Sequence, residues 1–263
     1  MTLSQPNQTG WYSPMVSPEH GVYVMLFVSF LVGAAASHQW TGATTLALIC
    51  AIAGFQAEHP WVLQIKQRSS WKPRLLVWGT IYAGISLSLA LYLAWQTPIL
   101  LGLYCAAIAA FAVDAFSVFR RQQKSFTNEL LTFAAVCLAA PFAYIATTGT
   151  WTIALLGLWL LNALFFSSAI FTVKLRKPKT ASLTPGLIYH AIASVIIVGL
   201  WYFSALNLLS AVAFGVALLK FGVILWQLDW YRTAKIQQIA MLETSSALLF
   251  FAIVVLDVTV SNV

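Results

Sequence analysis

The sequence predicts an all-α polytopic membrane protein with nine transmembrane helices, and three observations support this class. Of its 263 residues, 60% are hydrophobic and only 8% are charged, whereas about 25% are charged in an average soluble domain. The chain carries eleven Trp residues, and amphipathic rings of this kind collect at membrane interfaces. Apolar runs long enough to cross the hydrocarbon core, which takes about 20 residues, recur along the whole chain.

The same composition excludes several classes of protein. So few charges cannot solvate the surface of an ordinary cytosolic enzyme, and a disordered or nucleic-acid-binding chain needs a higher charge density than the net charge of +7 provides. Cys50, Cys105 and Cys137 are odd in number and dispersed in apolar runs, which argues against disulfides or a metal site. Phosphate-loop, nucleophile-elbow and zinc-binding motifs are absent. We therefore expect no metal, no cofactor and no nucleic-acid partner.

Local signals separate the spans in order along the chain. Ser17-Pro18 precedes the first span and Thr184-Pro185 opens the seventh, each an N-cap residue followed by Pro at the first helical position. Thr97-Pro98 separates the third span from the fourth, and the polar residues 147–150 separate the fifth from the sixth. We expect residues 1–17 to be a flexible tail and residues 18–263 to form a single domain. The predicted spans are 20–37, 41–57, 74–95, 97–119, 128–147, 151–173, 185–203, 205–226 and 236–258.

The basic residues orient these spans. All fourteen Lys and Arg residues lie in the segments that follow the second, fourth, sixth and eighth spans or near the ends of those spans, and the intervening turns contain none. By the positive-inside rule these segments are cytoplasmic, with the N-terminus inside and the C-terminus outside. The sequence thus predicts an integral protein of a bacterial plasma membrane or a photosynthetic membrane.

Acidic residues gather at the same ends, although acids contribute little to orientation. An ionised carboxylate within hydrocarbon costs about 2.5–3.5 kcal/mol and usually faces a partner or a water-filled cavity. We therefore predict a polar cavity that opens on the cytoplasmic side. The candidate catalytic residues are Glu243, Glu129, Asp114, Glu19 and His20. The candidate substrate-binding residues are Arg120, Arg121, Lys174, Arg176, Arg232, Glu58 and His190.

Each candidate also has a structural interpretation, which the sequence leaves open. Glu19 and Glu129 could complement the positive ends of their own helices, and Glu58 could simply end the second span at the interface. Asp114 could form a local pair with Arg121, and Glu243 could be paired for structural reasons alone. His190 could be a satisfied interior histidine, and the basic segments could serve orientation and lipid headgroup contacts.

Several short motifs resemble those of the YwiC-like family of bacterial membrane proteins. The stretch Ser17-Pro18-Glu19-His20-Gly21 is similar to the motif that opens this family. Further resemblances, in the same order as in the family, are Glu58-His59-Pro60, Arg120-Arg121 leading to Asn128-Glu129, Ala140-Pro141, Lys174-Leu175-Arg176, and Lys235 with Glu243.

The resemblance implies a nine-helix plan similar to that of UbiA-type intramembrane prenyltransferases. Those enzymes hold Mg²⁺ and a prenyl diphosphate with two acidic motifs, after the second and sixth helices. This chain departs from that pattern, because Glu58 stands alone after the second span and Lys174-Leu175-Arg176-Lys177 follows the sixth. Such cations repel a metal ion and can bind a phosphate or carboxylate directly.

Three functions remain open at this point. The first is a UbiA-like protein that binds an isoprenoid or another lipid with an anionic head, with a non-canonical transferase as its enzymatic form. The second is a lipid or quinone carrier or a small-solute transporter, in which His20 or His190 could pass protons. The third is an assembly protein for a membrane complex, which performs no chemistry. The lipid bilayer is a partner in all three.

Overall fold

The computed structural model describes residues 12–67, 70–177 and 181–260, and within these ranges it contains helices and no strand. The expectation for residues 1–11 of the N-terminal tail lies outside the described residues. The helices are α1 (His20–Ala36), α2 (Gly42–Gln67), α3 (Pro73–Gln96), α4 (Leu100–Phe119), α5 (Phe126–Cys137), α6 (Ala139–Thr148), α7 (Ile153–Lys174), α8 (Thr184–Tyr202), α9 (Leu208–Ala213), α10 (Gly215–Trp226), α11 (Leu228–Thr233) and α12 (Ile236–Val260).

The helices account for all nine predicted spans. Eight segments in the described part of the chain are long and apolar enough to cross a membrane, and α1 adds a shorter apolar helix of 17 residues. Helices α5 and α6 together form one of these segments, and α9 and α10 form another. The predicted class, an all-α polytopic membrane protein, is therefore confirmed.

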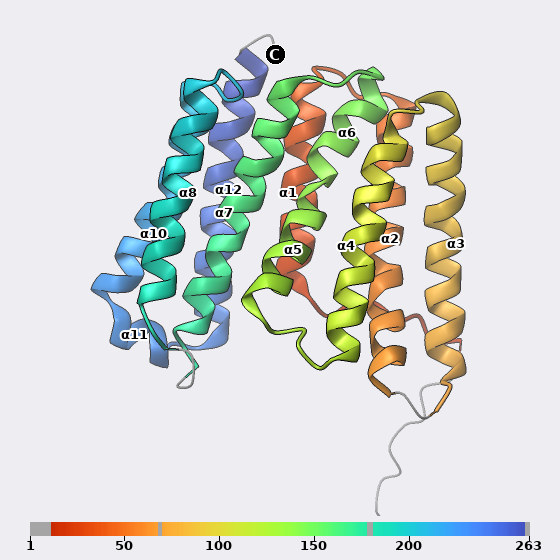
Figure 1. Ribbon diagram of the computed structural model, residues 1–263, viewed down its shortest axis with the longest axis horizontal. Helices are drawn as coiled ribbons and strands as arrows, with labels where there is room; N and C mark the ends of the chain where they lie inside the picture. Colours follow the sequence, from red (N-terminus) through yellow and green to blue (C-terminus); the bar gives the residue numbers. More distant parts are fainter. Residues whose placement is uncertain (1–11, 68–69, 178–180, 261–263) are drawn as a thin grey trace, which may run out of the picture.

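The links between helices alternate between two ends of the bundle (Figure 1). The α2–α3, α4–α5 and α7–α8 links and helix α11 lie at one end, which we call the basic end because Lys and Arg residues concentrate there. The described chain starts at the basic end and finishes at the opposite one (Figure 1). Helices α2, α3 and α4 form one side of the bundle, α7, α8, α10 and α12 form the other, and α1, α5 and α6 lie between them.

Small residues allow the central helices to touch at the backbone. A Cβ atom added to Gly33 of α1 would lie 1.9 Å from the carbonyl oxygen of Ala140 in α6. A Cβ atom on Gly157 of α7 would lie 2.0 Å from the carbonyl oxygen of Ala205. Because lipid tails are as apolar as Leu side chains, helices in a membrane associate through such close packing. The two glycines therefore set how closely α1 and α7 approach their neighbours.

The pass made of α5 and α6 is broken at Leu138. The Leu138 N–H bonds to Ala135 O at 3.1 Å, so it does not serve the carbonyl of Ala134. The Ala134 carbonyl instead accepts a hydrogen bond from the Nε1–H of Trp159 in α7, at 2.8 Å. Pro141 has no N–H to continue the helical pattern. Such breaks are tolerated within membranes where neighbouring groups satisfy the freed carbonyls.

The end of the N-terminal segment is attached to the bundle. Ser17 is buried, and its N–H donates to Gln56 Oε1 of α2 at 3.0 Å. The Nε–H of Arg74 in α3 donates to the carbonyl of Ser13 at 3.0 Å. Residues 12–17, which the sequence places in the tail, therefore contact α2 and α3.

The Gly33 contact leads to a stability prediction. We expect Gly33→Ala to lower the thermal unfolding temperature of the protein in detergent or nanodiscs, because the new methyl group overlaps the backbone of α6. Overpacking of this kind costs about 1–3 kcal/mol. Gly84→Ala is the matched control, since a Cβ atom there meets nothing within 4 Å. Equal unfolding temperatures for the two variants would contradict the close approach.

Candidate functional site

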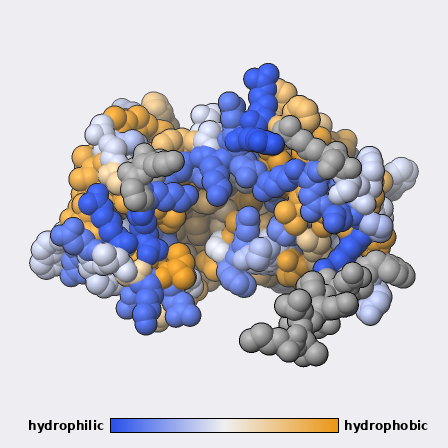
Figure 2. All heavy atoms as spheres, turned by 90° about the horizontal axis from the view of Figure 1, so that it is seen from below, coloured by the Kyte–Doolittle hydropathy of each residue, from blue (hydrophilic) through white to orange (hydrophobic). Residues whose placement is uncertain are grey.

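The basic end carries the residues that the sequence singles out. Figure 2 shows this end from below, with hydrophilic side chains around a hollow near the middle of the face. The predicted residues fall into separate groups, which lie on different sets of helices. Two of these groups are centred on ion pairs, and a third lies along α1, α2 and α4.

The first group surrounds Glu243 of α12. Its Oε2 atom lies 2.7 Å from Nζ of Lys220 in α10, and the side chains are 24% and 3% exposed, respectively. The hydroxyl of Thr172 in α7 donates to Glu243 Oε1 at 3.4 Å. Lys220 Nζ also lies 5.5 Å from the centre of the Phe165 ring. A buried lysine is tolerable here because a carboxylate and an aromatic face stabilise its charge.

Four polar atoms beside this group have no hydrogen-bond partner among the described residues. They are Ser168 Oγ, Arg176 Nε, His190 Nε2 and the hydroxyl oxygen of Tyr231. Most buried polar groups in proteins are paired, so each exception calls for an explanation. Burial raises the pKa of Tyr231 to about 12, and its hydroxyl therefore keeps its proton near neutral pH.

His190 and Arg176 are each held in place by a backbone carbonyl. His190 Nδ1 lies 2.7 Å from Gly186 O, and the ring stacks on Phe221 at a centroid distance of 4.0 Å. The Nη2 of Arg176 donates to the carbonyl of Ala234, in the link between α11 and α12. The sequence-predicted residues Glu243, His190 and Arg176 thus lie in one region, between α7, α8, α10 and α12.

The second group is built on Lys174, at the end of α7. Its Nζ atom lies 2.5 Å from Glu129 Oε2 in α5. The same ammonium donates to the carbonyl of Lys124 at 3.2 Å and lies 3.6 Å from the centre of the Phe126 ring. Lys174 therefore anchors the α4–α5 link and the start of α5.

The third group lies along α1, α2 and α4. Asp114 Oδ1 accepts hydrogen bonds from Asn128 Nδ2 at 2.6 Å and from the Thr132 hydroxyl at 3.5 Å, both in α5. Glu58 is half-buried in α2, within electrostatic reach of Asp114 and Glu19. Glu19 immediately precedes α1, is exposed, and makes no side-chain capping bond.

The remaining predicted residues lie on the surface of the basic end. His20, the first residue of α1, is exposed. Arg120 is exposed and its guanidinium lies 4.8 Å from the centre of the Phe116 ring. Arg232 is exposed and donates to the carbonyl of Ala181 at 3.4 Å. Arg121 differs from these three, because it lines a pocket.

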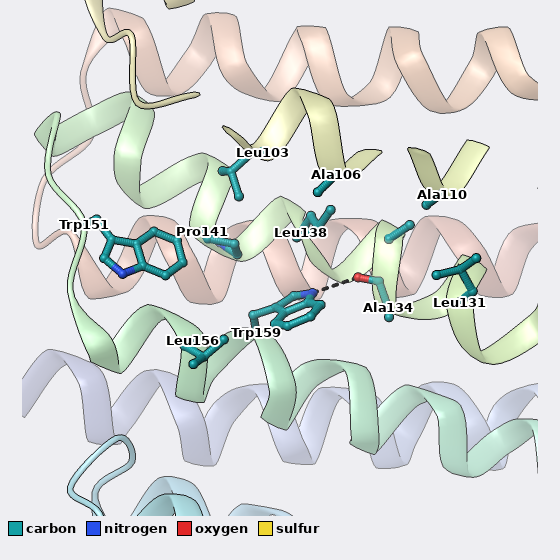
Figure 3. Close-up of a pocket in the computed structure, with 11 residues that line it drawn as sticks. Leu103, Ala106, Ala110, Leu131, Ala134, Leu138, Pro141, Trp151, Leu156 and Trp159 are labelled. Carbon is teal, nitrogen blue, oxygen red and sulfur yellow. Dashed lines mark hydrogen bonds between the residues drawn. The ribbon is translucent and has the colours of Figure 1, made fainter. Parts of the chain in front are cut away.

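An apolar cavity of about 330 Å³ lies between α4, the α5–α6 pass and α7. Figure 3 shows Leu103, Ala106 and Ala110 of α4 on one wall and the Trp159 ring on the other. The hydrogen bond from Trp159 to Ala134 fixes this ring against α5. The other lining residues are Leu131, Ala134, Ala135, Leu138, Pro141, Trp151 and Leu156.

A polar pocket of about 570 Å³ lies beyond this cavity, toward the basic end. Leu131 lines both. The α4 residues on the two walls follow one helix face, with spacings of three and four residues from Leu103 to Ser117. The two cavities therefore lie next to each other along α4, on either side of Leu131, and we call them together the groove. The polar pocket is lined by Val113, Ser117, Arg121, Gln122, Lys124, Ser125, Thr127, Asn128 and Leu131.

The polar pocket has the features of an anion site. Arg121 and Lys124 supply two cationic side chains. The pocket also includes the start of α5, where Ser125 accepts a hydrogen bond from the Asn128 N–H at 3.3 Å. The N-terminus of a helix carries a partial positive charge and favours anions. Among the described residues, no group of three or more His, Cys, Asp or Glu is placed to hold a metal ion.

Sequence reasoning missed several residues of these sites. Lys124, Trp159 and Lys220 were not singled out. One signal was available for the first group, because Ser168, Thr172 and Arg176 are spaced four apart along the sixth span and the turn that follows it. A second was the stripe of small residues at Ala106 and Ala110 on the fourth span.

The fold and these sites define an integral membrane protein, a helical bundle with ionisable groups at one end and an amphiphilic groove along one flank. The YwiC-like protein family matches residues 16–144. This match confirms, over that stretch, the resemblance to the YwiC-like family that the Glu19-His20-Gly21 opening indicates. Comparisons with curated proteins and with solved structures gave no match.

The buried pair of Lys220 and Glu243 leads to a second stability prediction. We expect Lys220→Met to destabilise the protein, because it leaves the Glu243 carboxylate without its counter-ion. Breaking a buried pair costs about 3–5 kcal/mol, and the partial exposure of Glu243 puts the expected loss at the lower end. Thermal unfolding in nanodiscs measures it.

The double variant Lys220→Met/Glu243→Gln is the control for this pair. It removes both charges, so we expect it to recover most of the lost stability. A double variant no more stable than Lys220→Met would show that the pair is not the source of the effect.

Proposed function

We propose that this protein binds a lipid with an anionic head, such as an isoprenoid phosphate or a phospholipid, in the groove between α4 and the α5–α6 pass. The position of the apolar cavity next to the cationic pocket, with Leu131 in the lining of both, carries the proposal. A ligand that fills both parts must combine a hydrocarbon chain with a negatively charged end, because each part favours a different chemistry.

The head of the ligand would lie in the polar pocket. Arg121 and Lys124 would pair with its charge, and the Ser125 and Thr127 region at the start of α5 would offer hydrogen-bond donors. Lys174 would act indirectly, because its contacts with Glu129 and with the Lys124 carbonyl hold the link that carries both cations.

The hydrocarbon chain of the ligand would follow α4 into the membrane. The distance along α4 from Ser117 to Leu103 is about 21 Å, at a rise of about 1.5 Å per residue, which covers about two thirds of a 30 Å hydrocarbon core. Alanine at positions 106, 110, 134 and 135 leaves room for a chain between the helices. Trp159 and Pro141 provide rigid apolar surface on the opposite wall.

The geometry favours binding over group transfer. Glu129 and Glu243 are engaged in ion pairs, and Asp114 accepts hydrogen bonds from Asn128 and Thr132. None of these three carboxylates lines the groove. We further propose that the basic end faces the cytoplasm, as the positive-inside rule predicts, so that the lipid would enter from the inner leaflet.

The head-group contacts can be tested with paired substitutions. We expect Arg121→Gln/Lys124→Gln to reduce binding of an anionic lipid at least tenfold, because two charge-assisted contacts are lost. The measurement is titration of nanodiscs of phosphatidylcholine with phosphatidic acid, followed by native mass spectrometry. Arg120→Gln is the matched control, since Arg120 is an exposed neighbour that does not line the pocket. An equal loss in the control would point to surface charge alone and refute the site.

The apolar part of the groove has its own test. We expect Ala106→Trp to lower retention of co-purified lipid several-fold, because the indole fills the cavity between α4 and the α5–α6 pass. Ala107→Trp is the control, because Ala107 is exposed on α4 and does not line the cavity. Lipid extraction and mass spectrometry of both purified variants give the ratio. Equal retention by the two variants would argue against the groove.

A further inference from the structure

We propose that the head group bound in the polar pocket is a phosphate monoester, the terminal phosphate of a lipid, and not the phosphodiester of an ordinary phospholipid. This inference rests on the lipid site proposed above and names the chemical class of its head group. Leu131, which Figure 3 shows at one end of the apolar cavity, also lines this pocket. A monoester carries three terminal oxygens and about 1.5–2 negative charges near neutral pH, whereas a diester has two such oxygens and one charge. The charges and donors of the pocket therefore decide between the two classes.

The first argument is the positive charge of the pocket. Arg121 and Lys124 line it and are exposed, and no Asp or Glu lines it. Among the described residues neither cation is part of an ion pair, because Glu129 is paired with Lys174. The carboxylate of Asp114 accepts hydrogen bonds from α5. Two cations without a counter-ion favour a ligand with nearly two negative charges, because each cation then gains a charge-assisted contact.

The second argument is the supply of donors at the start of α5. Ser125 is the N-cap residue, and its hydroxyl oxygen accepts a hydrogen bond from the N–H of Asn128 at 3.3 Å. In the part of the chain that the structure describes, the N–H groups of Phe126 and Thr127 have no hydrogen-bond partner, as is usual for the first turn of a helix. Ser125, Thr127 and Asn128 line the pocket. The start of α5 thus adds donors to the two cations, which suits a phosphate with three terminal oxygens.

The third argument is that hydrogen bonds hold the link between α4 and α5. The N–H of Gln122 donates to Ser117 O at 2.8 Å, and the N–H of Ser125 donates to Gln122 O at 2.9 Å. The ammonium of Lys174 donates to the carbonyl of Lys124 at 3.2 Å. The backbone that carries the two cations is therefore positioned before a ligand binds, which lowers the entropy cost of binding.

The backbone at Arg121 allows its side chain to be removed without disturbing the turn. Its φ is 61°, in the left-handed region, and its N–H donates to Val118 O at 3.0 Å after the end of α4. Glycine is usual at this position after a helix and adopts the conformation without strain. His38 has the same conformation after α1, with a φ of 55°, at the end of the bundle opposite the basic end (Figure 1). It offers a matched control position.

Lipid selectivity tests the proposal. Phosphatidylcholine nanodiscs receive equal small fractions of phosphatidic acid, a monoester, or phosphatidylglycerol, a diester, with the same acyl chains, and native mass spectrometry counts the bound lipid. We expect phosphatidic acid to bind about tenfold more tightly, because the diester offers one charge fewer to the two cations. Equal binding of the two anionic lipids would overturn the monoester and leave the lipid site standing. Binding of neither lipid above phosphatidylcholine would overturn both proposals.

Substitutions in the pocket locate the selectivity. We expect Arg121→Gly and Lys124→Gln each to lower the preference for phosphatidic acid over phosphatidylglycerol to about twofold or less, because the second charge of the monoester loses its partner. The unfolding temperature of Arg121→Gly should stay unchanged, since glycine fits the left-handed turn. His38→Gly should keep the full preference. A full preference in both pocket variants, or an equal loss in His38→Gly, would overturn the assignment.

A soluble competitor separates a lipid head group from a free phosphate monoester. Glycerol 3-phosphate carries the same monoester without acyl chains, so we expect it not to displace an equal concentration of phosphatidic acid, because it leaves the apolar cavity empty. Displacement at equal concentration would confirm the monoester and assign it to a soluble ligand, which would overturn the lipid site alone.

Discussion

The arrangement of the bundle depends on one constraint, which is that charges drawn into the membrane require partners on another helix. Helix α7 takes part in two such partnerships. Its last residue, Lys174, pairs with Glu129 on α5. Thr172, half a turn earlier, contacts the carboxylate of Glu243, which pairs with Lys220. The central helix α5 and the neighbouring helices α10 and α12 are thereby tied to the same end of α7. The polar pocket and the Glu243 region both take their positions from this attachment.

A hydrogen bond to the backbone fixes one wall of the groove. The interruption at Leu138 exposes the Ala134 carbonyl, and the Trp159 indole satisfies it from α7. That single bond fixes the aromatic wall of the cavity against the helix that lines its other side. The break and the cavity are therefore connected features, since a regular helix through residue 138 would leave the indole N–H without this acceptor.

The number of helices and most of their limits were predictable, because apolar length, Pro positions and the distribution of Lys and Arg are local properties of the chain. The end of the second span at residue 57 was predicted wrongly, since α2 continues through Pro60 to Gln67. The breaks at Leu138 and Phe214 were not foreseen, although Pro141 was visible. The partners of the charged residues could not be predicted. Glu129 and Lys174 are 45 residues apart in the sequence, and their contact depends on how α5 and α7 are rotated about their axes. This rotation could not be predicted, because both helices are apolar on most of their faces. Glu243 was predicted as a candidate catalytic residue, but its partner Lys220 was counted only among the basic residues near the ends of spans.

The pair formed by Glu129 and Lys174 also bears on how the chain can be divided. Residues 16–144, the stretch that matches the family, include the carboxylate but not its ammonium partner. Helix α1 likewise packs against α7 and α12, which lie beyond residue 144. A truncated fragment ending there would carry an uncompensated anion and an uncovered helix into the bilayer. The amino-terminal half consequently depends on the second half of the chain for the counter-ion of Glu129 and for the packing of α1.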